Sequence, residues 1–205
     1  MPEFFTSLFH QLIHTSALEW TATITGFLCV YLAARQHVLN WPISIISVSI
    51  YTFIFVENKL YGDALLQLYF LGTAIYGWFY WNKVSTSDYK PIILLSNQEL
   101  IRITLLIVFF TVLLGQLLDK FTDTDVPHID AFCTVTSFVA QYLMTRKILQ
   151  NWLLWIIVNL CYIPLYIHKD LILTAVLYMA FVIIAWNGYQ FWKKAFHKNN
   201  ENIDA

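Results

Sequence analysis

Seven apolar segments follow one another along this chain with little between them. Each is close to the roughly 20 apolar residues that a helix needs to cross the hydrocarbon core of a bilayer. They cover residues 18–36, 41–57, 61–81, 101–118, 131–147, 150–168 and 171–192. In the whole chain 59% of the residues are hydrophobic and only 12% are charged, which excludes an ordinary soluble domain. The sequence therefore predicts an all-α membrane protein with seven transmembrane helices.

The basic residues predict how these helices are oriented. With seven spans, the side of the N-terminus holds only Lys59, Lys120 and Lys169. The opposite side holds the rest: Arg35, Lys83, Lys90, Arg102, Arg146, Lys147, Lys193, Lys194 and Lys198. Because basic loops stay in the cytoplasm, we expect the N-terminus outside and the C-terminus in the cytoplasm.

An internal repeat is the second constraint on the fold. Shifting the chain by 111 residues aligns 22–83 with 133–194 without a gap, and 19 of the 62 aligned positions are identical. NWPISIISVSIY, which begins at Asn40, falls on NWLLWIIVNLCY, which begins at Asn151. Shared hydrophobicity does not explain the paired Asn-Trp, Gly and Arg residues. Such self-similarity indicates a duplicated unit.

The repeat predicts a 3+1+3 arrangement of helices. Each copy contains three spans, and the unrepeated span 101–118 returns the chain to its starting side, so the copies are parallel. Small transporters with parallel repeats bind substrate near the midplane where the repeats meet. A duplicated scaffold without transport is the alternative. The expected parts are an N-terminal, possibly interfacial segment (1–17), the first repeat (18–83), a linker with the connecting helix (84–129), the second repeat (130–194) and a cytoplasmic tail (195–205).

The spans carry neutral polar groups in place of charges. No Asp, Glu, Lys or Arg falls in the middle of any span, which argues against coupling to protons or sodium and favours facilitated diffusion. The serines and threonines are typical of contacts between packed helices. Trp78, Trp81 and Trp192 come at the ends of spans, where tryptophan commonly anchors a helix at the membrane interface.

The stretch NWLLWIIVN (151–159) contains the strongest candidates for a binding site. In a helix, Asn151, Trp155 and Asn159 recur every four residues and share one face. Unmet amides in hydrocarbon are costly, so they must face the protein interior. Trp155 and Asn159 have no counterpart in the first repeat, where Ser44 and Val48 occupy the equivalent positions. We therefore expect these two to contact the solute.

Other span residues extend this candidate site. Tyr51, Gln67 and Gln141 carry neutral groups that can donate and accept hydrogen bonds. An indole beside amides, without carboxylates, suits a flat heteroaromatic solute with polar substituents. If that solute is a delocalised cation, each aromatic face attracts it by about 0.5–2 kcal/mol.

Several other classes of function find no support in the sequence. The net charge of −1 gives no reason to expect a nucleic-acid partner. Cys29, Cys133 and Cys161 have no CxxC spacing, and the acidic loop 119–130 lacks the glycine and glutamate of a calcium loop. No cofactor motif, metal site or acid–base pair is evident. We therefore expect neither an enzyme nor a bound cofactor.

Three stretches carry a family resemblance: KLYGDALLQLYFLGTAIYGWFYW (59–81), DAFCTVTSFVAQYLMTRKILQNWLLW (130–155) and LYMAFVIIAWNGYQFW (177–192). They resemble the PnuC family of bacterial vitamin transporters. The resemblance extends from about residue 18 to residue 194, and its most specific parts are YGWxxW and MxRKxxxNWxxW. A typical member often has a glutamate before the NWxxW asparagine, where this chain has Gln150.

The resemblance implies a fold and a function. It implies seven spans on the plan of the SWEET proteins, a homotrimer, and facilitated diffusion of nicotinamide riboside that phosphorylation traps inside the cell. By motif, it implies that substrate is bound by Gln67, Asn151, Trp155 and Asn159, with Tyr178 and Asn187 as additions. Relatives carry thiamine and other vitamins, so the substrate stays open. A membrane scaffold or receptor that binds without transport is the alternative from another class.

Overall fold

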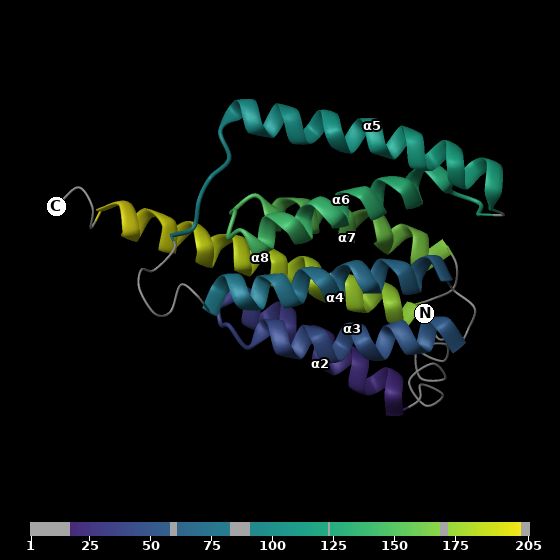
Figure 1. The fold of residues 1–205 in the computed structure, drawn as a ribbon, viewed down its shortest axis with the longest axis horizontal. Coiled ribbons are helices and arrows are strands. Elements are labelled where there is room, and N and C mark those ends of the chain that lie inside the picture. Colours follow the sequence, from purple (N-terminus) through teal and green to yellow (C-terminus); the bar gives the residue numbers. More distant parts are fainter. Residues whose placement is uncertain (1–16, 58–60, 83–90, 123, 169–171, 202–205) are drawn as a thin grey trace.

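The computed structural model describes residues 17–57, 61–82, 91–122, 124–168 and 172–201. These residues form seven helices, as the sequence predicts (Figure 1): α2 (Ala17–Ala34), α3 (Asn40–Glu57), α4 (Tyr61–Asn82), α5 (Asn97–Phe121), α6 (Pro127–Thr145), α7 (Asn151–His168) and α8 (Ile172–Glu201). Residues 1–16 of the predicted N-terminal segment lie outside the described residues. The helix α8 continues beyond the predicted span and includes most of the expected tail.

Three of the described helices are long and apolar enough, by length and composition, to cross a membrane. These regions are Asn97–Phe121, Asn151–His168 and Ala175–Lys198, and shorter apolar stretches occur at Thr23–Ala34 and Asn40–Ile54. An 18-residue helix such as α2 is about 27 Å long. That is close to the roughly 30 Å of a bilayer core, so the short helices of this protein match a membrane only when they lie nearly upright.

The helices pack as two groups of three, with α5 outside them. Within the groups α2 packs on α3 and α3 on α4, and likewise α6 packs on α7 and α7 on α8. Two pairs join the groups: α2 with α8, and α4 with α6. The helix α5 packs on α6 alone among the described helices and runs along the outside of the bundle (Figure 1). Below, α2–α4 is the first half and α6–α8 the second half.

The turns before α3 and α7 have the same backbone geometry. Gln36 and Lys147, which are 111 residues apart, both have φ of 56°, in the left-handed region. In each turn this residue donates its N–H to the carbonyl three residues earlier, Ala33 in one and Met144 in the other. Asn40 and Asn151 then donate their side-chain amides to the carbonyls of His37 and Ile148. The hydrogen bonds of one turn thus recur in the other at the repeat offset.

A tryptophan packs against a glycine at the equivalent place in each half. A Cβ on Gly77 would lie 2.6 Å from the Trp41 ring, and one on Gly188 would lie 2.9 Å from the Trp152 ring. Each indole also meets a second one edge-on: Trp41 and Trp81 have centroids 5.2 Å apart, and Trp152 and Trp192 have centroids 5.5 Å apart. We call this part of the bundle the tryptophan end. Only glycine leaves room for such close approach.

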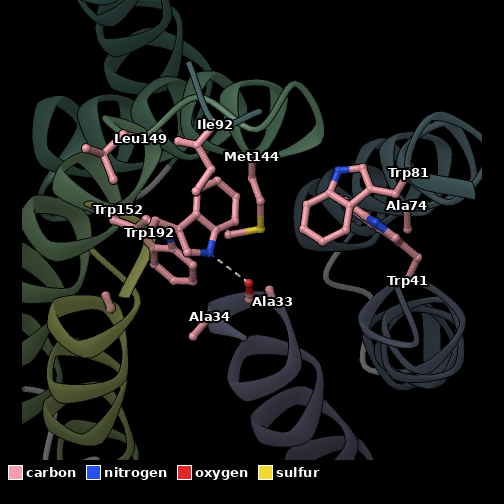
Figure 2. Packing of buried hydrophobic residues seen from close by; sticks show 11 residues of the cluster. Ala33, Ala34, Trp41, Ala74, Trp81, Ile92, Met144, Leu149, Trp152 and Trp192 are labelled. Atoms are coloured by element: carbon pink, nitrogen blue, oxygen red, sulfur yellow. Dashed lines mark hydrogen bonds between the residues drawn. The ribbon is translucent and has the colours of Figure 1, made fainter. Parts of the chain in front are cut away.

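These tryptophans are core residues (Figure 2). The exposed fraction is 1% for Trp41, 3% for Trp81 and 0% for both Trp152 and Trp192. The expectation that Trp81 and Trp192 anchor helices at the membrane interface is therefore wrong, whereas Trp78 is 37% exposed and retains that role as a prediction. The buried indoles gather because the helices that carry them converge on the two glycine contacts.

The segment before α5 is pinned to the turn between α6 and α7. Ile93 donates its N–H to Lys147 O (3.1 Å) and accepts from the N–H of Leu149 (3.0 Å), which forms a parallel β-bridge. The Leu95 N–H donates to Gln150 Oε1 at 3.2 Å, and Gln150 Nε2 donates to Leu95 O at 3.5 Å. Ile92 is buried among the residues of the tryptophan end (Figure 2). Gln150, which stands where the resembled family often has a glutamate, therefore holds this segment in place.

Substituting the two packed glycines with alanine should destabilise the fold. Gly77→Ala and Gly188→Ala place a methyl group against a buried indole, and such overpacking costs about 1–3 kcal/mol. Gly72→Ala is the matched control, because a Cβ at that position of α4 meets nothing within 4 Å. Thermal unfolding of the purified protein in detergent should show lower melting temperatures for the first two variants only. Equal melting temperatures for all three would contradict the packing.

Replacing Gln150 with Ala should release one end of the pinned segment. The Leu95 amide loses its acceptor, whereas the Ile93 amide keeps the Lys147 carbonyl. Hydrogen exchange should therefore become faster at Leu95 and change little at Ile93, because exchange reports local opening. Gln98→Ala, on the exposed first turn of α5, is the control. Unchanged exchange at Leu95 would exclude this role for Gln150.

Candidate functional site

Aromatic and amide side chains from α4 and α7 meet between the two halves. The rings of Phe70 and Trp155 lie 6.4 Å apart at 51°. One helical turn away from each ring are Gln67 on α4 and Asn159 on α7, on the same faces as these rings. Three of the predicted candidates are therefore brought to one region. The Trp155 indole N–H is buried there without a hydrogen-bond partner.

Two buried amides have no partner among the described residues. Asn159 on α7 is 7% exposed and Gln141 on α6 is 8% exposed, yet neither side chain forms a hydrogen bond with any described group. The half-buried amide of Gln67 is likewise unpaired within the described part of the chain. The amide atoms of these three residues are not among the fully buried polar atoms that lack a partner. Their hydrogen-bonding capacity is therefore available to another molecule.

Asn151 has a different environment from the other amides. It is fully buried at the start of α7, and its Nδ2 donates to the carbonyl of Ile148 in the preceding turn. Asn40 makes the equivalent bond to His37 at 2.8 Å in the first half. The side-chain oxygen of Asn151 has no partner in the structure. Its repeated hydrogen bond makes Asn151 part of the turn architecture, away from the other candidates by one or two helical turns.

Tyrosines form a second group toward the other end of α7. The Tyr178 ring on α8 lies 5.3 Å from that of Tyr162 and 4.9 Å from that of Tyr166, both on α7. Tyr51 on α3, the repeat counterpart of Tyr162, has its hydroxyl 3.2 Å from Thr23 Oγ1. The structure thus places two predicted candidates, Tyr51 and Tyr178, near an aromatic surface rather than among the amides.

Asn187 lies apart from both groups. Its side chain is exposed on α8, and no described contact joins it to the other candidates. It is more than two helical turns from Tyr178 along the same helix, toward the tryptophan end. No described contact therefore brings Asn187 to the Trp155 region, and the hydrogen bond of Asn151 belongs to the turn before α7.

The repeat offset reveals a chemical difference between the two sides of the bundle. Residues that are 111 positions from Gln67, Gln141, Trp155 and Asn159 are Tyr178, Val30, Ser44 and Val48, respectively. The unpaired amides and the indole thus belong to α4, α6 and α7, whereas their counterparts on α8, α2 and α3 are mainly aromatic or aliphatic. A solute between the halves would meet amides and an indole on one side, and hydroxyl, aromatic and aliphatic groups on the other.

Sequence reasoning missed four phenylalanines at the junctions of the halves. Phe27 on α2 stacks on Phe181 of α8 with centroids 4.7 Å apart. At the other junction the ring centroids of Phe138 on α6 and Tyr69 on α4 lie 4.4 Å apart. The Tyr69 hydroxyl donates to the Phe138 carbonyl at 2.9 Å. Phe27 aligns with Phe138 and Phe70 with Phe181 in the repeat. The identity of these phenylalanines at equivalent repeat positions was the sequence signal that could have identified them.

The described side chains of this region offer contacts for binding a solute. Among the described residues, no group of three His, Cys, Asp or Glu side chains is placed to hold a metal ion. The described residues of the Trp155 region offer aromatic faces, amide donors and amide acceptors, and none of the side chains named above is ionised at neutral pH. These groups suit a flat, polar organic solute.

Comparison with known proteins identifies the family. The sequence model of the family described as "nicotinamide mononucleotide transporter" matches residues 16–194. The chain belongs to this family. Membership places the protein among multi-pass membrane transporters, in agreement with its apolar helices.

Several known transporters are similar to this chain over most of its length. The nicotinamide riboside transporter PnuC of Escherichia coli is 27% identical, over 86% of this chain and 85% of the relative. That of Neisseria mucosa is 30% identical over 74% of this chain and 60% of the relative. The riboflavin/roseoflavin transporter RibM of Streptomyces davaonensis is 24% identical over 92% and 89%. A crystal structure of the vitamin B3 transporter PnuC matches with a TM-score of 0.72 and 26% identity, covering 95% of this chain and 90% of that one.

Leucine substitutions should separate the unpaired amides from the paired ones. Asn159→Leu and Gln141→Leu remove amides without described partners, so we expect an unchanged or higher melting temperature. Asn151→Leu and Asn40→Leu remove hydrogen bonds in the two turns and should cost about 1–3 kcal/mol. Thermal unfolding in detergent measures both. A large loss of stability in Asn159→Leu would indicate a structural role instead.

Proposed function

We propose that this protein transports nicotinamide riboside across a bacterial inner membrane by facilitated diffusion. The observation that carries the proposal is the pair of unpaired amides, Gln67 and Asn159, that lie one helical turn from the contact between Phe70 and Trp155, in a chain of this family. Nicotinamide riboside has a flat pyridinium ring, a carboxamide and ribose hydroxyls. The indole and phenyl faces suit the cationic ring, and the amides suit the carboxamide and hydroxyls.

The absence of charge in the spans favours the riboside over its phosphate ester. Nicotinamide mononucleotide carries a phosphate group, which proteins bind with arginine, lysine or helix N-termini. No lysine or arginine lies in the middle of a predicted span. The same lack of positive charge would keep a phosphorylated product from returning through the protein, so phosphorylation in the cytoplasm traps the imported solute.

Alternating access between the halves is the mechanism we propose. The first and second halves are the copies of a parallel 3+1+3 duplication, SWEET-like in plan, with α5 as the connecting helix. The contacts that recur at the 111-residue offset support this relation. Gln67, Gln141, Trp155 and Asn159 bind the solute near the midplane, and Tyr178 and Tyr51 extend the site toward the other end of α7. Asn151 supports α7 from the turn, and Asn187 joins the site only if α8 rotates.

We infer the orientation of the protein in the membrane and its oligomeric state from the sequence. The tryptophan end, which carries Arg35, Arg146 and Lys147, faces the cytoplasm, and the N-terminus faces outside. We propose a homotrimer, as the resemblance implies. Large apolar side chains on α5, such as Leu105 at 63% exposed and Phe109 at 61%, suit burial in lipid or against another copy of the chain.

Purified protein in liposomes should take up labelled nicotinamide riboside down its gradient when no proton or sodium gradient is present. A tenfold excess of unlabelled nicotinamide riboside should compete, whereas nicotinamide mononucleotide should not. Thiamine and riboflavin belong in the same panel, because RibM is similar to this chain. Uptake that requires an ion gradient would refute facilitated diffusion. Preferential competition by another vitamin would indicate that this vitamin is the substrate.

Trp155→Ala should weaken nicotinamide riboside binding about tenfold or more. The variant removes the aromatic face of the site, and loss of cation–π attraction together with apolar contact exceeds about 1.4 kcal/mol. Binding is measured as the ligand-dependent rise in melting temperature. Trp78→Ala is the control, since this indole is 37% exposed and lies outside the region. Equal affinity of the two variants would remove Trp155 from the site.

A further inference from the structure

Two indole hydrogen bonds connect the halves at the tryptophan end. Trp81, on α4 of the first half, donates from Nε1 to the carbonyl of Thr145 in the second half at 3.1 Å. Trp192, on α8 of the second half, donates to the carbonyl of Ala33 in the first half at 3.2 Å (Figure 2). Both acceptors lie at helix C-termini, where the last carbonyls have no partner within their own helix.

Cation–π contacts repeat the same cross-connection at the edge of the bundle. The Arg146 guanidinium lies 5.0 Å from the Tyr80 ring centroid, and the Arg35 guanidinium lies 5.4 Å from that of Phe191. Each arginine is at the end of the first helix of one half, and each ring is on the third helix of the other half. Arg146 also donates to the Tyr76 hydroxyl at 3.2 Å. Both junctions between the halves are therefore connected at this end.

The centre of this end is filled by rings from both halves. Trp81 and Trp192 have centroids 6.1 Å apart, and the Lys147 ammonium lies 4.8 Å from the Trp81 ring. Lys147 is only 6% exposed. The two tryptophans thus contact each other as well as the backbone of the opposite half. Separating the halves at this end requires that these contacts break together.

We propose that Trp81 and Trp192, through their bonds to the opposite half, form the gate that closes the tryptophan end during alternating access. The inference rests on the proposed function, because a gate has meaning only in a transporter. The α2–α8 and α4–α6 junctions separate at this end when the gate opens. The structure therefore represents a state closed at the tryptophan end.

The neighbouring tryptophans provide a matched control. Trp152 and Trp41 lie in the same cluster, but their indole N–H groups have no hydrogen-bond partner in the structure, and their glycine contacts stay within one half. Trp192→Phe and Trp81→Phe remove a bond between halves, whereas Trp152→Phe and Trp41→Phe remove none. All four variants replace an indole by a smaller ring, so the loss of packing is similar.

A cysteine reporter measures opening of the gate. Ala185 on α8 is 1% exposed and lies in the cluster two helical turns before Trp192, so Ala185→Cys is inaccessible while the end is closed. A membrane-impermeant maleimide added from the tryptophan side should label it about fivefold faster in Trp192→Phe, because one hydrogen bond is lost. Trp152→Phe should leave the rate nearly unchanged. The same variants without the reporter give the background from Cys29, Cys133 and Cys161.

Equal labelling of the Trp192→Phe and Trp152→Phe variants would overturn the gate. If these tryptophan variants fail to fold, Arg35→Gln and Arg146→Gln test the same junctions at less buried positions, with Arg102→Gln on α5 as control. Faster labelling only in the first two supports the gate, and no difference overturns it. Labelling requires no substrate, so it tests the gate independently of transport. If the variants label as expected but the protein does not take up nicotinamide riboside, the proposed substrate is refuted and the proposed gate is not.

Discussion

The close packing of an indole against a glycine, made once in each half, is the contact on which the fold depends. Trp41 on Gly77 and Trp152 on Gly188 bring the second and third helix of each half together. That approach also sets the positions of Trp81 and Trp192, which then reach the carbonyls of the opposite half. In lipid the hydrophobic effect does not drive helices together, so close van der Waals contact and hydrogen bonds must do so. The tryptophan end concentrates both.

The candidate site follows the opposite principle, because its polar groups lack protein partners. Asn40 and Asn151 satisfy part of their hydrogen-bonding capacity in the turns, whereas Gln141 and Asn159 do not among the described residues. An amide whose hydrogen-bonding capacity the protein does not use is available to bind a solute that satisfies it. The proposed function thus assigns stability and binding to different asparagines of the same NWLLWIIVN stretch, eight residues apart.

The helices were predictable because apolar length is a local property. The predicted spans 61–81 and 150–168 differ by one residue from Tyr61–Asn82 and Asn151–His168. The prediction was too short where polar residues continue a helix: Ser96 and Glu99 form a capping box that starts α5 before its apolar part, and α8 extends to Glu201. Asn151 and Asn187 show why the binding site was harder to predict than the helices. The sequence gives the amide of each residue but not whether that amide faces the other candidate residues. Which residues a side chain contacts depends on the rotation of its helix, and helical spacing alone does not specify that rotation.

The sequence by itself determined the number of helices among the described residues, the 111-residue offset and the types of side chain available to a solute, because each is a property of local composition or of self-comparison. Only the tertiary structure decided which tryptophans are buried, which amides lack partners and which helices join the halves. Trp78 and Trp81 are three residues apart in the same apolar helix, yet one is 37% and the other 3% exposed. The difference arises because Trp81 faces α6 and the carbonyl of Thr145, a neighbour that lies 64 residues away in the chain and is brought close only by folding.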